Sequence, residues 1–367
     1  MNILITGGAG FIGSHVSDAL IEEGHNVTLL DNLSGTDSKK PTYLNEGAKL
    51  IVGDVRDRKL ITELTSKADV IFHFAAKVGI AQSNYQIREF VDNNCVGTAE
   101  LLEAIIGLQK RPKLIVAASN TSYGEGLYAC TKCNAEFHPA IRSQLDVENY
   151  GMDPICPKCG SKARPIPTKE DTPLDTNSIY ALTKKFQEET ALMTGRMYGF
   201  PVVALKFFNV FGPRQSLSNP YTGVSAIFTS RIKNDNPVVI YEDGKQTRDF
   251  VYIKDVVRAC VMAMKESKTD YSVINIGSGK PTTIFDLAKI LYHILGKEEH
   301  IEISNIYRKG DIRHCIADTS KAKMMLGWIP ETDFEQGIKE MLEWAQKEKA
   351  EDRFEQAQNE LKDKKLI

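Results

Sequence analysis

Short apolar runs alternate with longer amphipathic stretches through the first half of the chain and a little beyond it. Six runs have the length of buried strands, at residues 2–6, 27–31, 50–52, 70–74, 114–118 and 202–208. Helical periodicity lies between them, most clearly at residues 12–23, 98–106 and 178–198. Strands that alternate with helices form parallel sheets with both faces covered. We therefore predict an α/β fold with a doubly wound parallel sheet.

The pattern changes in two places. Residues 125–167 contain two close pairs of cysteines and no long hydrophobic periodicity, so we interpret them as an insertion. Beyond residue 213, short strands at 238–241 and 273–276 mix with helical stretches, which predicts a smaller second lobe.

These changes divide the chain into three parts. We expect a first domain over residues 1–212, a C-terminal lobe over 213–345 and a charged tail over 346–367. The tail mixes acidic and basic residues, so we expect a solvated helix or a frayed end.

Composition and charge exclude several classes of protein. The 367 residues are 42% hydrophobic and 26% charged, which excludes global disorder. The formal net charge of -2 argues against a nucleic-acid partner held by net positive charge. No apolar run approaches the ~20 residues of a membrane span. The N-terminus lacks the features of a signal peptide, so we expect a cytoplasmic protein without a membrane partner.

A glycine-rich turn follows the first predicted strand and precedes the first predicted helix. Gly7, Gly10 and Gly13 are spaced G-x-x-G-x-x-G, with Phe11 and Ile12 between the last two. Glycines allow a tight turn and a close approach to a pyrophosphate, and the helix N-terminus favours negative charge. This context predicts a dinucleotide site; the alternative is a purely structural turn.

Further cofactor candidates lie at the ends of the next strands. Asp31 ends the second strand and could bind the ribose hydroxyls of adenosine; Asn32 follows it without a basic residue for a 2′-phosphate. NAD is therefore favoured over NADP. Other candidates flank the third and fourth strands: Asp54, Val55, Ala75 and Ala76. Asp31 could instead cap a loop, Asp54 could belong to a simple turn, and the alanines could serve packing.

Tyr180 and Lys184 form the candidate catalytic pair. They are four residues apart on a predicted helix and so share one face. A phenol has a free pKa of ~10, and a nearby ammonium favours the phenolate. Ser119 ends the fifth strand and could hydrogen-bond a substrate oxygen. A surface helix pair and a strand-end cap are the structural alternatives.

These motifs, in this order, resemble the extended short-chain dehydrogenase/reductases of the nucleotide-sugar epimerase/dehydratase type. The likeness extends to Asn94, Asn209, Arg248 and Arg308. It implies a Rossmann fold, tightly bound NAD contacted by residues that include Asn94, Tyr180 and Lys184, and a C-terminal lobe for a nucleotide-diphosphate sugar. It also implies that Asn209 contacts this substrate and that the two arginines clamp its diphosphate.

The resemblance leaves some roles open. The two arginines could instead form structural ion pairs, with Asp249 or Asp311 as partners. The family often forms homodimers through two helices per subunit, which here match residues 91–106 and 179–198.

The residues after Ser119 favour one reaction within the family. Its 4,6-dehydratases carry an acid and a base at the positions of Asn120 and Thr121, whereas neither residue here is a carboxylate. The resemblance therefore implies 4-epimerisation: transient oxidation at the sugar C4 and reduction from the opposite face.

The insertion has the spacing of a metal site. Cys130 and Cys133 form one C-x-x-C pair, and Cys156 and Cys159 form another. Two such pairs predict a structural zinc ribbon in which all four ligands are cysteines. A redox pair, or a site in which His138 replaces one cysteine, is the alternative.

A cysteine-bearing insertion at this place resembles the dTDP-L-rhamnose 4-epimerases within the family. Residues 78–83 and 212–223 add to this likeness. A UDP-glucose/UDP-galactose 4-epimerase is the second interpretation. A nucleotide-sugar reductase and a non-catalytic dinucleotide sensor are further alternatives.

Overall fold

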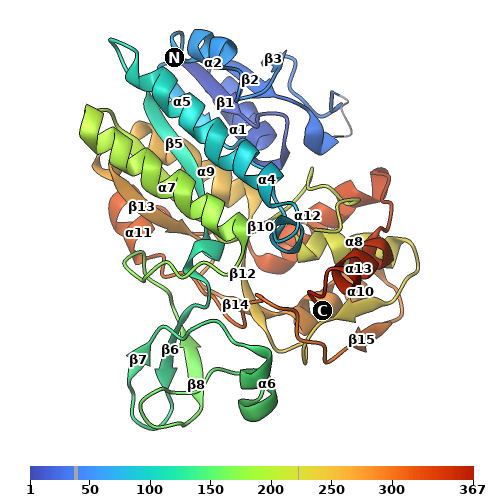
Figure 1. Cartoon of the computed structure of the whole chain (residues 1–367). Helices are drawn as coiled ribbons and strands as arrows, with labels where there is room; N and C mark the ends of the chain where they lie inside the picture. The colour runs from blue at the N-terminus through green and yellow to red at the C-terminus, as the bar shows by residue number, and fades with distance from the viewer. Residues whose placement is uncertain (37–39, 222) are drawn as a thin grey trace.

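A seven-stranded parallel sheet forms the centre of the molecule (Figure 1). The computed structural model describes residues 1–36, 40–221 and 223–367, so Thr222 of the segment 212–223 lies outside the described residues. Across the sheet the strands run in the order β13 (Ser272–Ile276), β9 (Val202–Phe207), β5 (Lys113–Ser119), β4 (Val70–His73), β1 (Asn2–Thr6), β2 (Asn26–Asp31) and β3 (Lys49–Val52).

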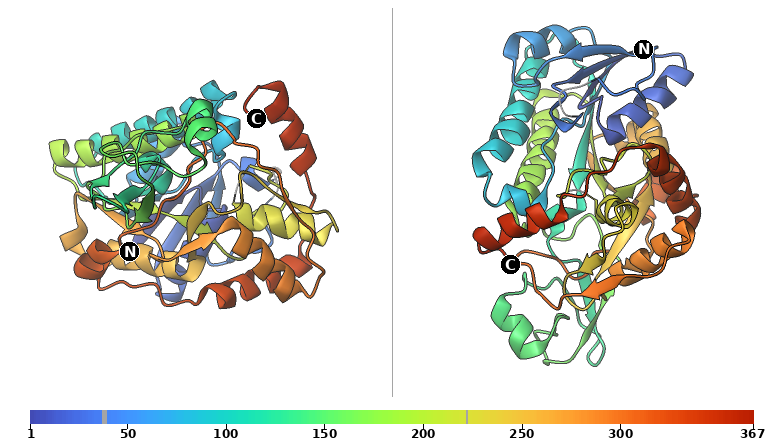
Figure 2. Two further views of the ribbon diagram at one scale, coloured as in Figure 1. Left: turned by 90° about the horizontal axis from the view of Figure 1, so that it is seen from below. Right: turned by 90° about the vertical axis from the view of Figure 1, so that its right-hand side faces the viewer.

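Helices cover both faces of this sheet, which confirms the predicted doubly wound architecture (Figure 2). One face carries α1 (Phe11–Glu22) and α9 (Ile253–Lys265), and the other carries α2 (Arg58–Thr65), α5 (Gly97–Ile106) and α7 (Ile179–Tyr198). Side chains alternate along β1, so that Ile3 and Ile5 enter one apolar cluster and Leu4 the other.

Smaller elements build the C-terminal lobe. One sheet contains β10 (Asn209–Phe211), β12 (Thr247–Tyr252) and β14 (Pro281–Thr283), and another pairs β11 (Val238–Ile240) with β15 (Ile301–Ile303). The helices of this part are α8 (Val224–Lys233), α10 (Ile284–Leu295), α11 (Ser320–Leu326) and α12 (Phe334–Lys347). Short helices α3 (Ile80–Ser83) and α4 (Ile87–Phe90) and the π-helical turn η2 (Val91–Val96) precede α5.

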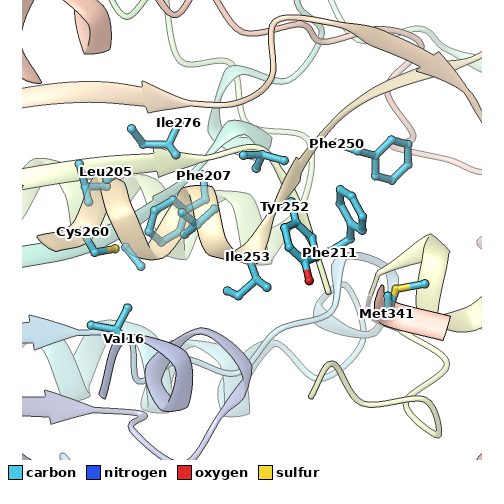
Figure 3. Packing of buried hydrophobic residues seen from close by; sticks show 14 of the residues in the cluster. Val16, Leu205, Phe207, Phe211, Phe250, Tyr252, Ile253, Cys260, Ile276 and Met341 are labelled. Carbon is cyan, nitrogen blue, oxygen red and sulfur yellow. The ribbon is translucent and has the colours of Figure 1, made fainter. Parts of the chain in front are cut away.

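The boundary expected after residue 212 does not separate the large sheet from the lobe. Residues 272–276, assigned from sequence to the second lobe, form edge strand β13 of the large sheet, and α9 packs on α1. One apolar cluster runs from Val16 and Leu205 to Phe250 and Met341 (Figure 3). The chain leaves the sheet after β9 and returns to it, which local periodicity alone does not reveal.

The insertion forms a small unit that projects from the body (Figure 1, green). It contains a three-stranded antiparallel sheet of β7 (Glu136–Phe137), β6 (Leu127–Cys130) and β8 (Ala163–Ile166). Helix α6 (Gln144–Tyr150) lies between β7 and β8 along the chain.

The charged tail is neither frayed nor fully solvated. It ends in α13 (Phe354–Asp363), whose apolar residues Phe354, Ala357 and Leu361 are buried. Buried Arg231 of α8 pairs with Asp352, just before this helix. The expected helix is present, whereas the frayed end is wrong and full solvation is wrong, because one apolar stripe is enough to pack a helix with an otherwise charged surface. Within the described residues, no helix is long and apolar enough to cross a membrane.

Candidate functional site

The glycine-rich turn connects β1 to α1 and leaves the start of the helix open. Gly7 has φ +70, and a Cβ atom there would lie 2.7 Å from the Ala75 nitrogen. A Cβ atom on Gly13 would lie 2.4 Å from the Gly7 oxygen. Among the described residues no side chain caps α1 at Gly10, and its first turn, which contains Phe11 and Ile12, has no acidic residue. The free N–H groups and the helix dipole therefore fit an anionic pyrophosphate.

The acidic candidates of β2 and the loop after β3 lie near this turn. The Asp31 carboxylate accepts hydrogen bonds from the Ala9 and Leu33 nitrogens at 3.0 and 2.8 Å. Asp31 thus caps the loop, as the structural alternative expects. Its pKa is raised by burial, although the backbone N–H donors oppose this effect.

Asp54 is held by its neighbours. Asn32 donates to its carboxylate at 3.0 Å, and Arg56 pairs with it at 2.7 Å. These hydrogen bonds, chiefly the one from Arg56, lower the pKa of Asp54. Val55 is buried beside Gly97. These residues form a polar edge next to the glycine turn, and a direct contact with adenosine stays a prediction.

The Asn94 side chain holds the segment after β4 in place through hydrogen bonds to the Lys77 backbone. The Asn94 side chain accepts from the Lys77 nitrogen at 2.7 Å and donates to the Lys77 oxygen and to Thr183 Oγ1. This fixes the path of Ala75 and Ala76 over the sheet and ties it to α7. Since the buried amide is engaged in these bonds, the structure gives Asn94 a positioning role, and its expected contact with the cofactor stays a prediction.

Ser119, Tyr180 and Lys184 gather where β5 ends against α7. Burial raises the pKa of Tyr180 to about 12, and a hydrogen bond with the Ser119 side chain opposes this rise. Burial lowers the pKa of Lys184 to about 8, while the charge of Glu188 opposes this fall. Helix α7 thus presents a phenol and an ammonium, and β5 presents a hydroxyl, in a poorly solvated region, as general acid–base catalysis requires.

Several residues that support this group were missed from the sequence. Ser83 Oγ accepts from the Tyr180 nitrogen at 2.9 Å, and Gln187 accepts from Lys184 Nζ at 2.8 Å. Gln187 also donates to Thr98, which contacts buried His73. Gln187 lies one turn after Lys184 and could have been noticed by helical spacing, whereas the contacts of Ser83 and His73 depend on tertiary structure alone.

A cavity in the C-terminal lobe reaches the residues that directly follow Ser119. Its lining brings together the predicted substrate residues Asn209, Arg248 and Arg308 with Asn120 and Thr121, which follow Ser119 directly. Ser119, Tyr180 and Lys184 themselves are not among the lining residues that the structure describes. The sequence analysis missed part of the wall, which α13 supplies through Phe354, Ala357, Gln358 and Leu361.

The tail helix bridges both lobes over the cavity. Tyr85, just after α3, donates to the Glu360 carboxylate at 2.9 Å, and Tyr221 also donates to it. The cavity is therefore enclosed by segments from the beginning, middle and end of the chain.

The polar residues of the cavity differ in their partners. Arg308 pairs with Asp311 at 2.8 Å, as one structural alternative expects, and its guanidinium lies 5.3 Å from the ring centre of Tyr241. Arg248 donates to the Thr247 and Arg313 oxygens, and Asp249 instead accepts from Ser278, Gly279 and Ala317. Asn209 Oδ1 is buried and has no partner among the described residues. An unpaired buried acceptor of this kind suits a ligand donor.

The four paired cysteines of the insertion meet in space. Their sulfurs all lie within 4.8 Å of one another, with Cys130 Sγ 3.5 Å from Cys159 Sγ and Cys133 Sγ 3.7 Å from Cys156 Sγ. His138 lies elsewhere, since its Nε2 is 2.7 Å from the Glu125 carbonyl oxygen. The alternative in which His138 replaces a cysteine is therefore wrong.

Comparisons with known proteins agree with this architecture. The profile of the NAD dependent epimerase/dehydratase family matches residues 3–144, and that of GDP-mannose 4,6 dehydratase matches residues 160–341. The region between the two matches lies inside the insertion. The dTDP-L-rhamnose 4-epimerase of Burkholderia thailandensis is 34% identical over 358 residues, which cover 94% of this chain and 95% of that protein.

Solved structures are similar over nearly the whole chain. A UDP-glucose 4-epimerase of Thermotoga maritima with UDP-glucose has a TM-score of 0.78 and 34% identity, covering 95% of this chain and 99% of that one. A UDP-glucuronic acid 4-epimerase of Bacillus cereus, in complex with UDP-glucuronic acid and NAD, has a TM-score of 0.76 and 28% identity, covering 94% and 99%. The chain therefore belongs to the NAD-dependent epimerase/dehydratase family.

Proposed function

We propose that this protein is a nucleotide-sugar 4-epimerase that works with tightly bound NAD. The observation that carries the proposal is the grouping of Ser119 and Tyr180, with Lys184 one turn further along α7, and with no carboxylate at Asn120 or Thr121. Ser119 and Tyr180 can orient a sugar hydroxyl and remove its proton, whereas water elimination has no acid–base pair at these positions.

The residues present fit NAD. The open N-terminus of α1 suits the pyrophosphate, and Asp31 and Asp54 lie at the edge where adenosine would bind. When bound, NAD would supply the hydride acceptor and donor at the sugar C4. Tyr180 would hold or release the hydroxyl proton, and the charge of Lys184 would favour its phenolate.

A nucleoside diphosphate fits the rest of the cavity. Arg248 and Arg308 present planar guanidinium groups that suit phosphate oxygens. For the sugar we favour L-rhamnose linked to dTDP, supported by the relative of that name and by the apolar side chains of Ile80 and Ala81 in the cavity lining, which would suit a C6 methyl group. UDP-glucose or UDP-galactose is the second candidate, supported by the Thermotoga maritima structure.

Incubation of the purified protein with each nucleotide sugar, without added cofactor, tests this function. NMR would follow the configuration at C4, with Tyr180→Phe as the inactive control. Conversion of dTDP-L-rhamnose supports the full proposal. Conversion of UDP-glucose alone moves the substrate to the second candidate, and no conversion of any substrate by NAD-containing protein contradicts the epimerase proposal.

We also propose that the four cysteines bind a structural zinc ion. Tetrahedral thiolates with Zn–S distances of about 2.3 Å lie about 3.8 Å apart, close to the separations of 3.5 and 3.7 Å here. A disulfide would need a sulfur separation of about 2 Å. Metal analysis should find one zinc per chain, lost in Cys133→Ser but kept in Cys95→Ser, a control outside the cluster. Zinc-free wild type that keeps its fold would contradict this site.

Finally, we propose that the protein is a homodimer. Apolar side chains are exposed along α7 and the adjoining η2: Leu182, Phe186, Met193, Met197, Val91 and Val96. An apolar face of this kind on a pair of neighbouring helices suits burial against a second copy. Light scattering after size-exclusion chromatography should give twice the 40.9 kDa chain mass, and a monomer at micromolar concentration would contradict the proposal.

A further inference from the structure

The insertion is joined to the wall of the cavity by a buried network of charges. Arg142 of the insertion donates to Glu125 at 3.2 Å and to Glu242, which follows β11, at 2.9 Å. Arg313 donates to Glu242 at 2.8 Å and to Asp153 of the insertion at 2.7 Å. Arg142 and Arg313 are 7% and 1% exposed, so this network is part of the interior and not of the surface.

Arg142 also holds the segment that carries Arg308. Its guanidinium donates to the Asp311 carbonyl oxygen at 3.0 Å, and its own carbonyl accepts from the Tyr307 hydroxyl. Arg308 lies between these two attachment points and is paired with the Asp311 side chain. One residue of the insertion therefore holds the Tyr307 side chain and the Asp311 backbone, on either side of an arginine that lines the cavity.

We propose that the insertion positions the phosphate-binding part of the cavity and that Arg142 is the positioning residue. This inference rests on the proposed function and deepens it. Without the Arg142 cation, Glu242 would keep the Arg313 guanidinium, whereas Glu125 would keep the backbone N–H groups of Arg313 and His314 as donors. Arg248 is another guanidinium that interacts electrostatically with both carboxylates. It would be drawn towards them and away from the cavity, while the Tyr307–Asp311 segment would lose the guanidinium bond to the Asp311 carbonyl oxygen.

Arg142→Met tests this role because it keeps the length of the side chain and removes its charge and hydrogen bonds. We expect the Kd for UDP and dTDP and the KM for the nucleotide sugar to rise about 10- to 100-fold, as for other displaced binding groups. The kcat value should change less than about threefold, because Tyr180 and Ser119 lie on elements that Arg142 does not contact. Arg142→Lys should fall between wild type and Arg142→Met.

Arg164→Met is the matched control, since Arg164 is an exposed arginine of the same insertion. It should leave Kd, KM and zinc content unchanged. A nucleotide Kd within about twofold of wild type in folded Arg142→Met would overturn the proposal. An equal effect of Arg164→Met would also overturn it.

A second variant covers the case in which Arg142→Met does not fold. Tyr307→Phe removes only the hydroxyl bond to the Arg142 carbonyl and should raise the nucleotide Kd by about 3- to 10-fold; an unchanged Kd in this variant would overturn the proposal. Binding of UDP or dTDP needs no turnover. Failure of the epimerase assay in wild type would therefore leave the nucleotide measurement intact and distinguish the two proposals.

Discussion

Replacing Lys184 with methionine tests how the proposed catalytic pair of Tyr180 and Lys184 works, because the change removes the ammonium and keeps most of the side chain. Burial raises the pKa of Tyr180 to about 12. Forming its phenolate at pH 7 from that value costs about 7 kcal/mol. The pKa of Lys184, lowered by burial to about 8, still leaves most of this side chain charged at pH 7.

The contribution of Lys184 follows from its spacing on α7. Side chains four residues apart on a helix have Cβ atoms about 5–6 Å apart. A unit charge about 5 Å away contributes about 3 kcal/mol at an effective dielectric constant of about 20. Lys184→Met should therefore lower kcat about 100-fold at pH 7. The deficit should narrow as pH rises, because the variant gains phenolate and Lys184 of the wild type loses its proton above about pH 8.

The assay is the initial rate of epimerisation from about pH 6.5 to about pH 9.5, with retained NAD measured in parallel. Lys185→Met is the control, because the adjacent Lys185 ammonium donates to the Leu174 carbonyl and not to the catalytic group. A wild-type to Lys184→Met rate ratio that stays constant across this range would refute the electrostatic argument. Lys184 would then act only by holding a ligand.

Three further changes test the cofactor turn, the tail and the dimer. Gly13→Ala should abolish NAD retention, measured by absorbance of the released nucleotide, because its Cβ atom would lie 2.4 Å from the Gly7 oxygen. Gly35→Ala is the control and should retain NAD, because Gly35 has open space around it. NAD retention by Gly13→Ala would contradict the turn geometry. Leu361→Ala should lower the free energy of unfolding by about 2–5 kcal/mol in denaturant titrations and raise KM, because Leu361 is buried and lines the cavity. Lys362→Ala, at an exposed position of the same helix, is its control. An unchanged KM in Leu361→Ala would contradict a role for α13 in binding. Met193→Glu should give a monomer by light scattering, whereas Met324→Glu on α11 should not, and a Met193→Glu dimer would move the interface elsewhere.

The parts of the fold and site that could be predicted from sequence depend on short-range patterns. The parallel sheet follows from apolar runs that alternate with amphipathic helices. Gly7 and Gly13 could be recognised because their backbone contacts exclude any side chain. Tyr180 and Lys184 could be paired because one helix brings residues four apart to the same face.

The remaining parts depend on contacts between distant segments. Strand β13 returns to the edge of the large sheet about 65 residues after β9, and nothing in its own five residues marks this return. Ser83 reaches the start of α7 across 97 positions. In the sequence, Arg142 cannot be distinguished from any other charged loop residue. Its contacts with Glu242 and Asp311 arise only in the folded chain.

The tail shows why charge alone misleads about the position of a helix. Residues 354, 357 and 361 lie on one face of α13, each about one helical turn from the next. Burial of this narrow stripe leaves all the remaining positions of the helix free to be polar. The same polarity then provides attachments, since Glu360 accepts from Tyr85 and Tyr221, whose hydroxyl oxygens lie 2.9 Å apart. The proposed cofactor half of the site is thus built by the ends of neighbouring parallel strands, whereas the cavity proposed for the substrate is lined mainly by the C-terminal lobe and α13, with the insertion attached to the Arg308 segment through Arg142. We therefore expect substrate preference to change through the C-terminal lobe and α13, and only indirectly through the insertion, while the proposed catalytic group on β5 and α7 stays the same. Neither the glycine turn nor the Tyr180–Lys184 pair then identifies the sugar.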